Sequence, residues 1–203
     1  MCLIAYPSLY MCLHPKYDDQ IDRIENDPKM NLSNVFSDEQ NLTTESCSYY
    51  ETSDLDSLHA DNYKMKVLHL NIRSLQKHND NLRNLLELLK DSQCEIDVVL
   101  ICESHITPKN NLENCKIPGY TLYEKHRTLR DGGGGIAIFV NSKLKFTKRD
   151  DLCIFDEYEF ESLFIEVKLG NKRSVIIGEV YRVPNTDIGN FFQKYQSIVD
   201  NVI

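Results

Sequence analysis

The chain has 203 residues, enough for one domain of ordinary size, and its composition, 41% hydrophobic, does not exclude a packed core. The formal net charge of −8 is uneven: residues 1–63 hold twelve acidic and three basic residues, whereas residues 64–203 hold nineteen and twenty. An acidic chain argues against a nucleic-acid partner, because phosphate binding relies on Lys and Arg. Here that argument applies only to the first 63 residues, so a DNA substrate stays open for the rest.

The first 63 residues are expected to form a disordered acidic tail. Residues 14–63 are rich in Asp, Asn, Ser and Glu and show neither strand nor helix periodicity. Such a segment cannot bury enough apolar surface to offset its ordering entropy. Residues 1–13 are more apolar, but they lack the basic segment of a signal peptide and are too short to span a bilayer. We therefore predict no signal peptide and no membrane anchor.

Ordered structure is predicted to begin at residue 64 with a β-α-β unit. Residues 65–73 and 96–102 are short, mainly apolar runs that are typical of buried strands. Between them, leucines at helical spacing predict an amphipathic helix that ends near residue 90: Leu75, Leu82, Leu85, Leu86 and Leu89. A right-handed crossover would place the two strands in one sheet.

Antiparallel strands and a final helix are predicted for the remainder. Residues 160–169 and 174–181 alternate around a turn at Gly170 and Asn171, which is typical of a hairpin, and strand-like runs occur at 120–123 and 136–140. Residues 188–203 have apolar positions at helical spacing. The glycines at 132–135 lack the Lys and Ser/Thr of a nucleotide-binding loop, so we interpret them as a close backbone approach or a flexible entry to a strand.

The cysteines and histidines give no metal-binding pattern in the sequence. The seven cysteines show neither CxxC pairs nor His partners at zinc-finger spacing, and we interpret them as reduced thiols of an intracellular protein. The histidines of the predicted folded part also lack ligand spacing: His69, His78, His105 and His126. We interpret His69 as a hydrogen-bonded core residue.

Polar residues stand where three predicted buried strands end: Asn71, Glu103 and Tyr181. Strand ends often carry sites, because the rigid strand fixes the side chain while the loop admits substrate. For each residue alone, a polar side chain that meets water is the simpler interpretation. Glu103 is the most informative, since a carboxylate that ends an apolar strand is costly to desolvate unless a cation meets it. One carboxylate with water and substrate phosphate is a common Mg²⁺ site.

Four motifs in this order resemble the endonuclease/exonuclease/phosphatase superfamily, and among its branches they look most like the endonucleases of non-LTR retrotransposons. They are residues 70–75 (LNIRSL), 101–104 (ICES), 131–140 (DGGGGIAIFV) and 178–185 (GEVYRVPN). The resemblance covers residues 64–203 and implies an α/β fold, a two-sheet sandwich of the DNase I-like and AP-endonuclease-like kind. It also implies Mg²⁺-dependent nicking of DNA to prime reverse transcription, a reverse transcriptase domain downstream, and a nuclear location for an active element.

The resemblance further implies roles for single residues. Asn71 matches the active-site Asn, Glu103 the metal-binding Glu, and Tyr181 the Tyr that contacts the scissile phosphate. Asn185 matches a loop Asn that can touch the DNA backbone. Arg182 is expected to contact phosphate, although a solvated surface Arg is an equal alternative.

The sequence departs from the family pattern in two ways. Arg73 stands where some relatives place an Asp near the metal, which leaves fewer acids at the ion. The Gly-Asp-Phe-Asn strand and the Ser-Asp-His motif, which supply the water-orienting Asp and the catalytic His, are expected after the last helix and do not occur in the 203 residues. We therefore expect that residues 64–203 are the N-terminal part of such an endonuclease domain, that they form an incomplete sandwich, and that they are inactive alone. Two alternatives stay open: a phosphatase of the same superfamily, and a non-catalytic remnant or interaction module.

Overall fold

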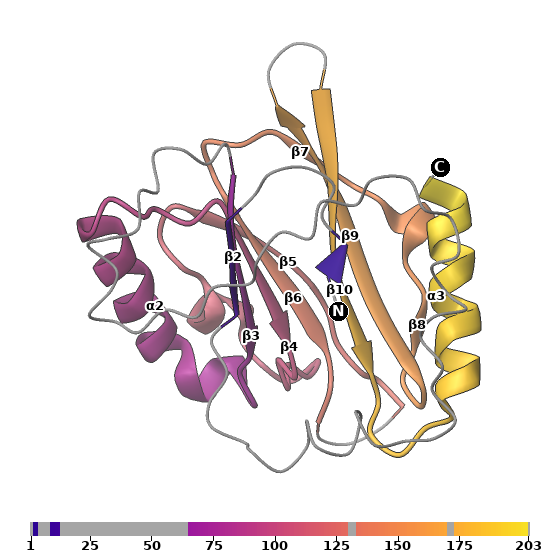
Figure 1. The fold of residues 1–203 in the computed structure, drawn as a ribbon. Helices are drawn as coiled ribbons and strands as arrows, with labels where there is room; N and C mark the ends of the chain where they lie inside the picture. The colour runs from indigo at the N-terminus through magenta and orange to yellow at the C-terminus, as the bar shows by residue number, and fades with distance from the viewer. Residues whose placement is uncertain (1, 4–8, 13–64, 130–132, 170–172, 203) are drawn as a thin grey trace, which may run out of the picture.

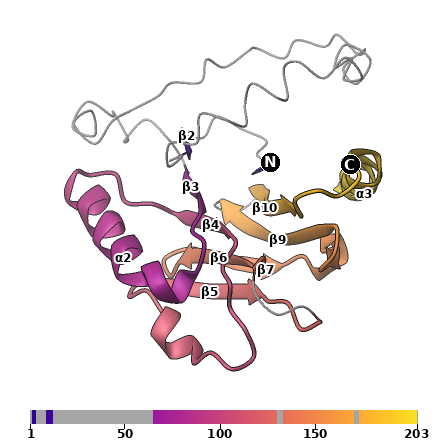
Figure 2. The ribbon, with the colours of Figure 1, turned by 90° about the horizontal axis from the view of Figure 1, so that it is seen from below.

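A computed structural model describes residues 2–3, 9–12, 65–129, 133–169 and 173–202. These residues form four layers, α-β-β-α, in which two sheets face each other (Figures 1 and 2). Helix α2 (Leu75–Asp91) covers the outer face of one sheet and helix α3 (Ile188–Val202) the outer face of the other. The predicted two-sheet α/β sandwich is therefore confirmed. Within the described residues, no helix combines the length and the hydropathy of a membrane span.

The first sheet contains the predicted β-α-β unit. Its strand order is β2-β3-β4-β6-β5, with β3 and β4 parallel and joined by α2, and with β6 antiparallel to both of its neighbours. The strands are β2 (Leu9–Cys12), β3 (Lys66–Asn71), β4 (Val98–Cys102), β5 (Tyr120–Lys125) and β6 (Ile136–Asn141). All residues of β4 and β6 are buried, because both strands lie inside the sheet and side chains pack on both faces of it.

The second sheet is built on the predicted hairpin. Its strand order is β1-β10-β9-β7, and β8 also pairs with β9. The strands are β1 (Cys2–Leu3), β7 (Phe146–Lys148), β8 (Phe155–Asp156), β9 (Phe160–Leu169) and β10 (Arg173–Arg182). Two 3-10 helices, η4 (Leu112–Cys115) and η5 (Asp150–Leu152), lie in the connections. The predicted turn residues 170 and 171 lie outside the described residues.

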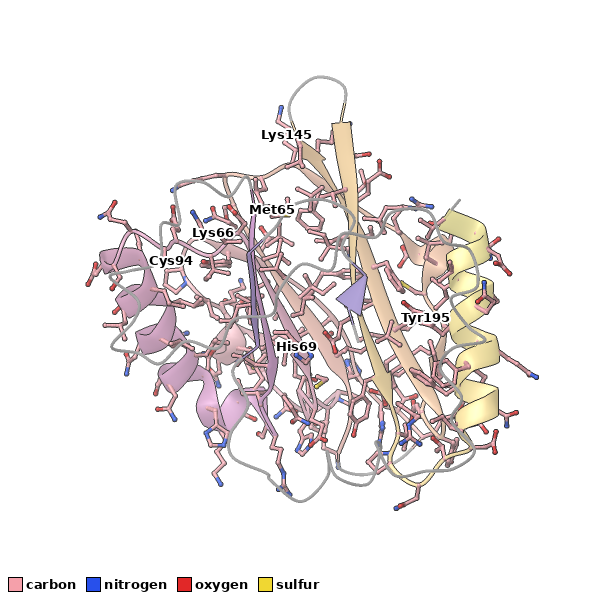
Figure 3. All side chains as sticks on the ribbon, viewed as in Figure 1. Met65, Lys66, His69, Cys94, Lys145 and Tyr195 are labelled. Carbon is pink, nitrogen blue, oxygen red and sulfur yellow. The ribbon has the colours of Figure 1, made fainter. Side chains whose placement is uncertain are left out.

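Apolar side chains form one core between the sheets and one beneath each helix. In β9, Leu163 and Ile165 face the core between the sheets, whereas Phe160 and Phe164 pack beneath α3. The alternation of core-facing and helix-facing residues along β9 follows the two-residue period of a strand. Tyr195 lies between α3 and the second sheet (Figure 3). Each fully buried Leu, Ile or Phe contributes about 1.5–3 kcal/mol, so the middle core holds the two sheets together and the outer two hold each helix on its sheet.

Helix α2 begins directly after the loop that follows β3. Its N-cap is Ser74, whose Oγ accepts a hydrogen bond from the Lys77 backbone N–H at 3.4 Å. A capping hydroxyl of this kind satisfies one of the free N–H groups of the first turn. The buried side chains Leu75, Leu82 and Leu86 confirm the predicted amphipathic face. The cap therefore stabilises the start of α2 at Leu75.

The predicted tail of residues 1–63 differs from the structure near its start. Residues 2–3 pair with β10 and residues 9–12 pair with β3, so their backbone extends one edge of each sheet. The physical reason is that residues 1–13 are more apolar than the acidic segment after them. Residues 13–64 lie outside the described residues, and their lack of structure stays a prediction.

Candidate active site

Three strands from the two sheets end at the same edge of the sandwich. β3, β4 and β10 all run to the lower edge in Figure 1. β3 and β4 are parallel, with Asn71 opposite Cys102, so Asn71 and Glu103 leave the sheet as neighbours. β10 carries Tyr181 to this edge from the other sheet.

The three predicted site residues meet through one carboxylate oxygen. The Asn71 Nδ2 amide donates a hydrogen bond to Glu103 Oε1 at 3.0 Å, and the Tyr181 hydroxyl donates to the same oxygen at 3.0 Å. The Glu103 side chain is 20% exposed. Asn71 is exposed, whereas Tyr181 is half-buried. The arrangement is a carboxylate that is fixed by two donors and open to solvent on one side.

The electrostatics keep Tyr181 in its donating form. Burial and then the nearby charge of Glu103 raise the pKa of the Tyr181 hydroxyl above its ordinary value. The phenol is therefore protonated at neutral pH and can donate to Glu103 or to a bound phosphate oxygen.

The backbone around Glu103 is held in an unusual conformation. Glu103 has a φ of 53° and His105 a φ of 50°, in the left-handed region that residues other than glycine rarely adopt. Arg73, Ser74 and Asn185, in the loops after β3 and β10, also have positive φ. Strained backbone of this kind clusters at functional sites, because the surrounding structure must hold it in place. The concentration of these residues beside one edge supports a functional site there.

The glycine run forms backbone hydrogen bonds with the loop that follows β4. The Ser104 and His105 N–H groups donate to the carbonyls of Gly135 and Gly134, both at 2.9 Å. A Cβ on Gly135 would lie 2.7 Å from Ser104 Oγ, and one on Gly134 would lie 2.1 Å from the guanidinium of Arg127. These distances confirm the interpretation of the glycines as a close backbone approach.

A buried ion pair beside this loop has no counterpart in the sequence-based prediction. Arg127 and Glu161, 6% and 0% exposed, form an ion pair through Arg127 Nε. The second carboxylate oxygen of Glu161 accepts a hydrogen bond from the Gly135 N–H at 2.8 Å. Arg127 and Glu161 are 34 residues apart, and only the unusual Glu within an apolar strand could have pointed to this pair.

His105 joins the site, although the sequence analysis assigned it no role. Its Nε2 lies 3.7 Å from Glu103 Oε2, and this buried nitrogen has no hydrogen-bond partner among the described residues. Burial lowers the pKa of His105; the charge of Glu103 opposes the shift, while Arg73 and Arg127 add to it. A neutral imidazole next to a carboxylate could accept a proton or bind a metal. The signal in the sequence was the Glu-x-His spacing.

Arg182 is the last residue of β10 and Asn185 lies in the turn that follows; both are exposed. The Arg182 guanidinium donates to the carbonyl of Thr186 at 2.9 Å, so it braces this turn. Neither residue belongs to the hydrogen bonds that join Asn71, Glu103 and Tyr181. Their contacts with nucleic acid stay a prediction.

The oxygens of Glu103 are suited to a hard cation. Both donors use Oε1, and Oε2 accepts no hydrogen bond from a described residue. Mg²⁺ prefers oxygen ligands and is often bound by one or two carboxylates together with substrate phosphate and water. Glu103 therefore fits such an ion through Oε2, and it fits best when a phosphate is present.

The comparisons with known proteins find similarity to solved structures. No family model matches the chain, and no curated protein matches it. Among solved structures, the endonuclease domain of TRAS1, a telomere-specific non-LTR retrotransposon, aligns with a TM-score of 0.47 and 14% identity over 68% of this chain. The chain spans about half of that structure, 53%. A similarity of this size carries no argument about function, and the fold described above rests on its own strand order.

Proposed function

We propose that this chain carries the metal-binding and phosphate-binding part of a Mg²⁺-dependent endonuclease that nicks DNA for a non-LTR retrotransposon. The observation that carries the proposal is the junction of Asn71, Glu103 and Tyr181 on one carboxylate oxygen. The order and form of the four sequence motifs support the same family.

The three residues would act on the metal and on the phosphate in the proposed reaction. A bound Mg²⁺ would neutralise charge on the scissile phosphate, and Glu103 would hold it through Oε2. Asn71, with two amide hydrogens, would orient Glu103 and donate to a phosphate oxygen, whereas Tyr181, with one hydroxyl hydrogen, would donate either to Glu103 or to the phosphate. Among the described residues, Glu103 is the carboxylate that joins this network. We further propose that the water-activating Asp and His are those of the two family motifs that do not occur in this sequence, and that the 203 residues alone are therefore inactive.

The experiment compares the 203-residue chain with a fusion to the second half of a related endonuclease. We expect the fusion to nick supercoiled DNA in Mg²⁺ and the chain alone to show no nicking. In the fusion, Glu103→Gln should lower the rate by roughly 100-fold or more, because residues that act as a unit each cost orders of magnitude. Glu113→Gln is the control, since Glu113 is an exposed residue of η4 that pairs with Lys116.

Two results would contradict the proposal. Glu103-dependent nicking by the chain alone would show that the water-activating group lies within it. A folded fusion that hydrolyses inositol phosphates but does not nick DNA would favour the phosphatase branch instead.

A further inference from the structure

A second cluster of ligand-type side chains lies between the sheets, directly behind the candidate active site. It consists of His69 on β3, Cys102 on β4 and Glu179 on β10, and their ligand atoms all lie within 4.8 Å of one another. His69 Nε2 is 3.0 Å from Glu179 Oε1 and 4.0 Å from Cys102 Sγ. His69 lies in the lower half of β3, away from Met65 and Lys66 at the other end (Figure 3).

The cluster is a polar group within an apolar core. Cys102 is 5% exposed, and the core between the sheets around it contains Leu100 and Ile177. The Glu179 side chain is 1% exposed, and its Oε2 has no hydrogen-bond partner among the described residues. An unpaired oxygen on a buried carboxylate is costly, so such a group is normally matched by a cation or a donor. His69 reaches Oε1 but leaves Oε2 unmatched.

The three donors suit a borderline metal ion. An imidazole nitrogen, a thiolate sulfur and a carboxylate oxygen are all zinc ligands, whereas Mg²⁺ selects oxygen ligands only. Zn–N and Zn–S bonds of roughly 2.0 and 2.3 Å place the two ligand atoms about 3.5 Å apart in a tetrahedral site. The distance of 4.0 Å between His69 and Cys102 is close to this value.

Three protein ligands are enough for one class of zinc site. Structural zinc sites usually have four protein ligands, whereas sites with three protein ligands keep a water in the fourth position. His69, Cys102 and Glu179 match the second class.

We propose that His69, Cys102 and Glu179 form a zinc site that ties β3, β4 and β10 together beneath the candidate active site. Asn71 and Tyr181 lie two residues beyond His69 and Glu179 on the same strands. A metal held here would fix the spacing of the strands that carry the active-site residues. The site is distinct from the Mg²⁺ position at Glu103, and it stands whether or not the chain cleaves DNA.

The test uses the 203-residue chain after dialysis against a chelator. Zn²⁺ is titrated in competition with a chromophoric chelator, and Co²⁺ is used as a spectroscopic probe. We expect one ion per chain and a thiolate-to-cobalt charge-transfer band in the near ultraviolet. Cys102→Ser should remove the band and weaken zinc binding by at least about 100-fold, more than is typical for residues that only support a ligand. Cys94→Ser is the matched control, because Cys94 is a buried cysteine in the core beneath α2.

A second measurement keeps the proposal testable if Cys102→Ser does not fold. Zinc should slow the alkylation of Cys102 of the unaltered chain in mild denaturant by a clearly larger factor than that of Cys94, which it protects only by stabilising the fold. The proposal is wrong if the chain takes up no zinc, or if the charge-transfer band is absent. It is also wrong if Cys94→Ser removes the band while Cys102→Ser leaves it unchanged.

Discussion

Tyr181 and Glu103 are 78 residues apart in the sequence, yet the Tyr181 hydroxyl donates a hydrogen bond to Glu103 Oε1 at 3.0 Å. Tyr181 belongs to β10 of the second sheet, whereas Glu103 follows β4 of the first. This bond therefore crosses the interface between the two sheets at the edge where the candidate active site lies. The proposed site exists only when both sheets are docked.

Tyr181→Phe tests whether this hydrogen bond serves function more than stability. The ring keeps its packing in the core between the sheets, and Asn71 still holds Glu103. We expect a loss of about 1 kcal/mol in the free energy of unfolding in urea. In the fusion described above, we expect a fall of at least about tenfold in the nicking rate.

The matched control for Tyr181→Phe is Tyr123→Phe. Tyr123 also faces the core between the sheets, and its hydroxyl donates to Asp150 Oδ1 at 2.6 Å. It should lose similar stability without losing activity. Equal activity losses in the two variants would contradict a specific role for Tyr181.

Gly134→Ala should be far more destabilising than Gly119→Ala. Both glycines have positive φ, 63° and 82°, so both variants bear backbone strain. A Cβ on Gly119 meets nothing within 4 Å, whereas one on Gly134 would lie 2.1 Å from the buried Arg127 guanidinium. We expect about 1 kcal/mol for Gly119→Ala and about 1–3 kcal/mol more for Gly134→Ala, because overpacking adds to strain. Urea denaturation of both variants measures the difference, and equal losses would show that Arg127 moves freely.

Lys194→Met should lower the free energy of unfolding at neutral pH, and this loss relative to the unaltered chain should disappear in acid. Lys194 Nζ lies 2.7 Å from Asp156 Oδ2 and 2.7 Å from Glu159 Oε2, and so ties α3 to the segment around β8. Hydrogen bonds from Lys194 lower the pKa of both carboxyl groups below their ordinary values of 3.8 and 4.5. A lowered carboxyl pKa stabilises the fold above the unfolded pKa, and this contribution is lost as pH falls through the folded pKa.

The stability gap between the unaltered chain and Lys194→Met should therefore be constant above about pH 5 and should narrow as pH falls below 4.5 and then 3.8. The gap itself should be small, because these groups are partly exposed to solvent. Thermal melts across this pH range give the measurement. Lys77→Met, at an exposed lysine of α2, should show no such pH dependence, and a gap that widens in acid would refute the assignment.

Limited proteolysis tests the acidic segment between residues 13 and 64. Its composition predicts that a broad-specificity protease cleaves there first and leaves residues 65–202 intact. Mass spectrometry of the early fragments locates the cuts. Early cleavage within β4 or β6, with the acidic segment intact, would overturn the prediction.

Local patterns predicted the parts of the fold that depend on local interactions. The leucine spacing gave α2, and the alternation around residues 170–171 gave the hairpin, because periods of 3.6 and 2 are properties of single elements. The ends of the apolar runs also located Asn71, Glu103 and Tyr181. The meeting of Asn71 and Glu103 was predictable because paired parallel strands end at the same sheet edge, whereas Tyr181 reaches them from the other sheet.

Contacts across the sandwich left no such pattern in the sequence. Arg127 and Glu161 are 34 residues apart, and His69 and Glu179 are 110 apart, so neither pair has a spacing that a local reading detects. The metal-ligand rules for cysteine assume short spacings, whereas Cys102 meets His69 through the pairing of β3 with β4 and meets Glu179 through the packing of the two sheets. The strand pairings of residues 2–3 and 9–12 were not predicted, because the composition of the acidic segment after them led us to assign residues 1–63 to one disordered tail.

Because the proposed site is divided between two sheets, ligand binding is coupled to the docking of the sheets. A phosphate or metal ion that contacts both Glu103 and Tyr181 binds only the docked sandwich, so saturating ligand raises the melting temperature by mass action. The converse would also hold for the proposed site: a core substitution such as Ile138→Ala or Ile165→Ala lowers the population of the docked form, and the apparent affinity would fall in proportion to that population. The affinity of the proposed site would thus depend partly on the packing of the hydrophobic interior.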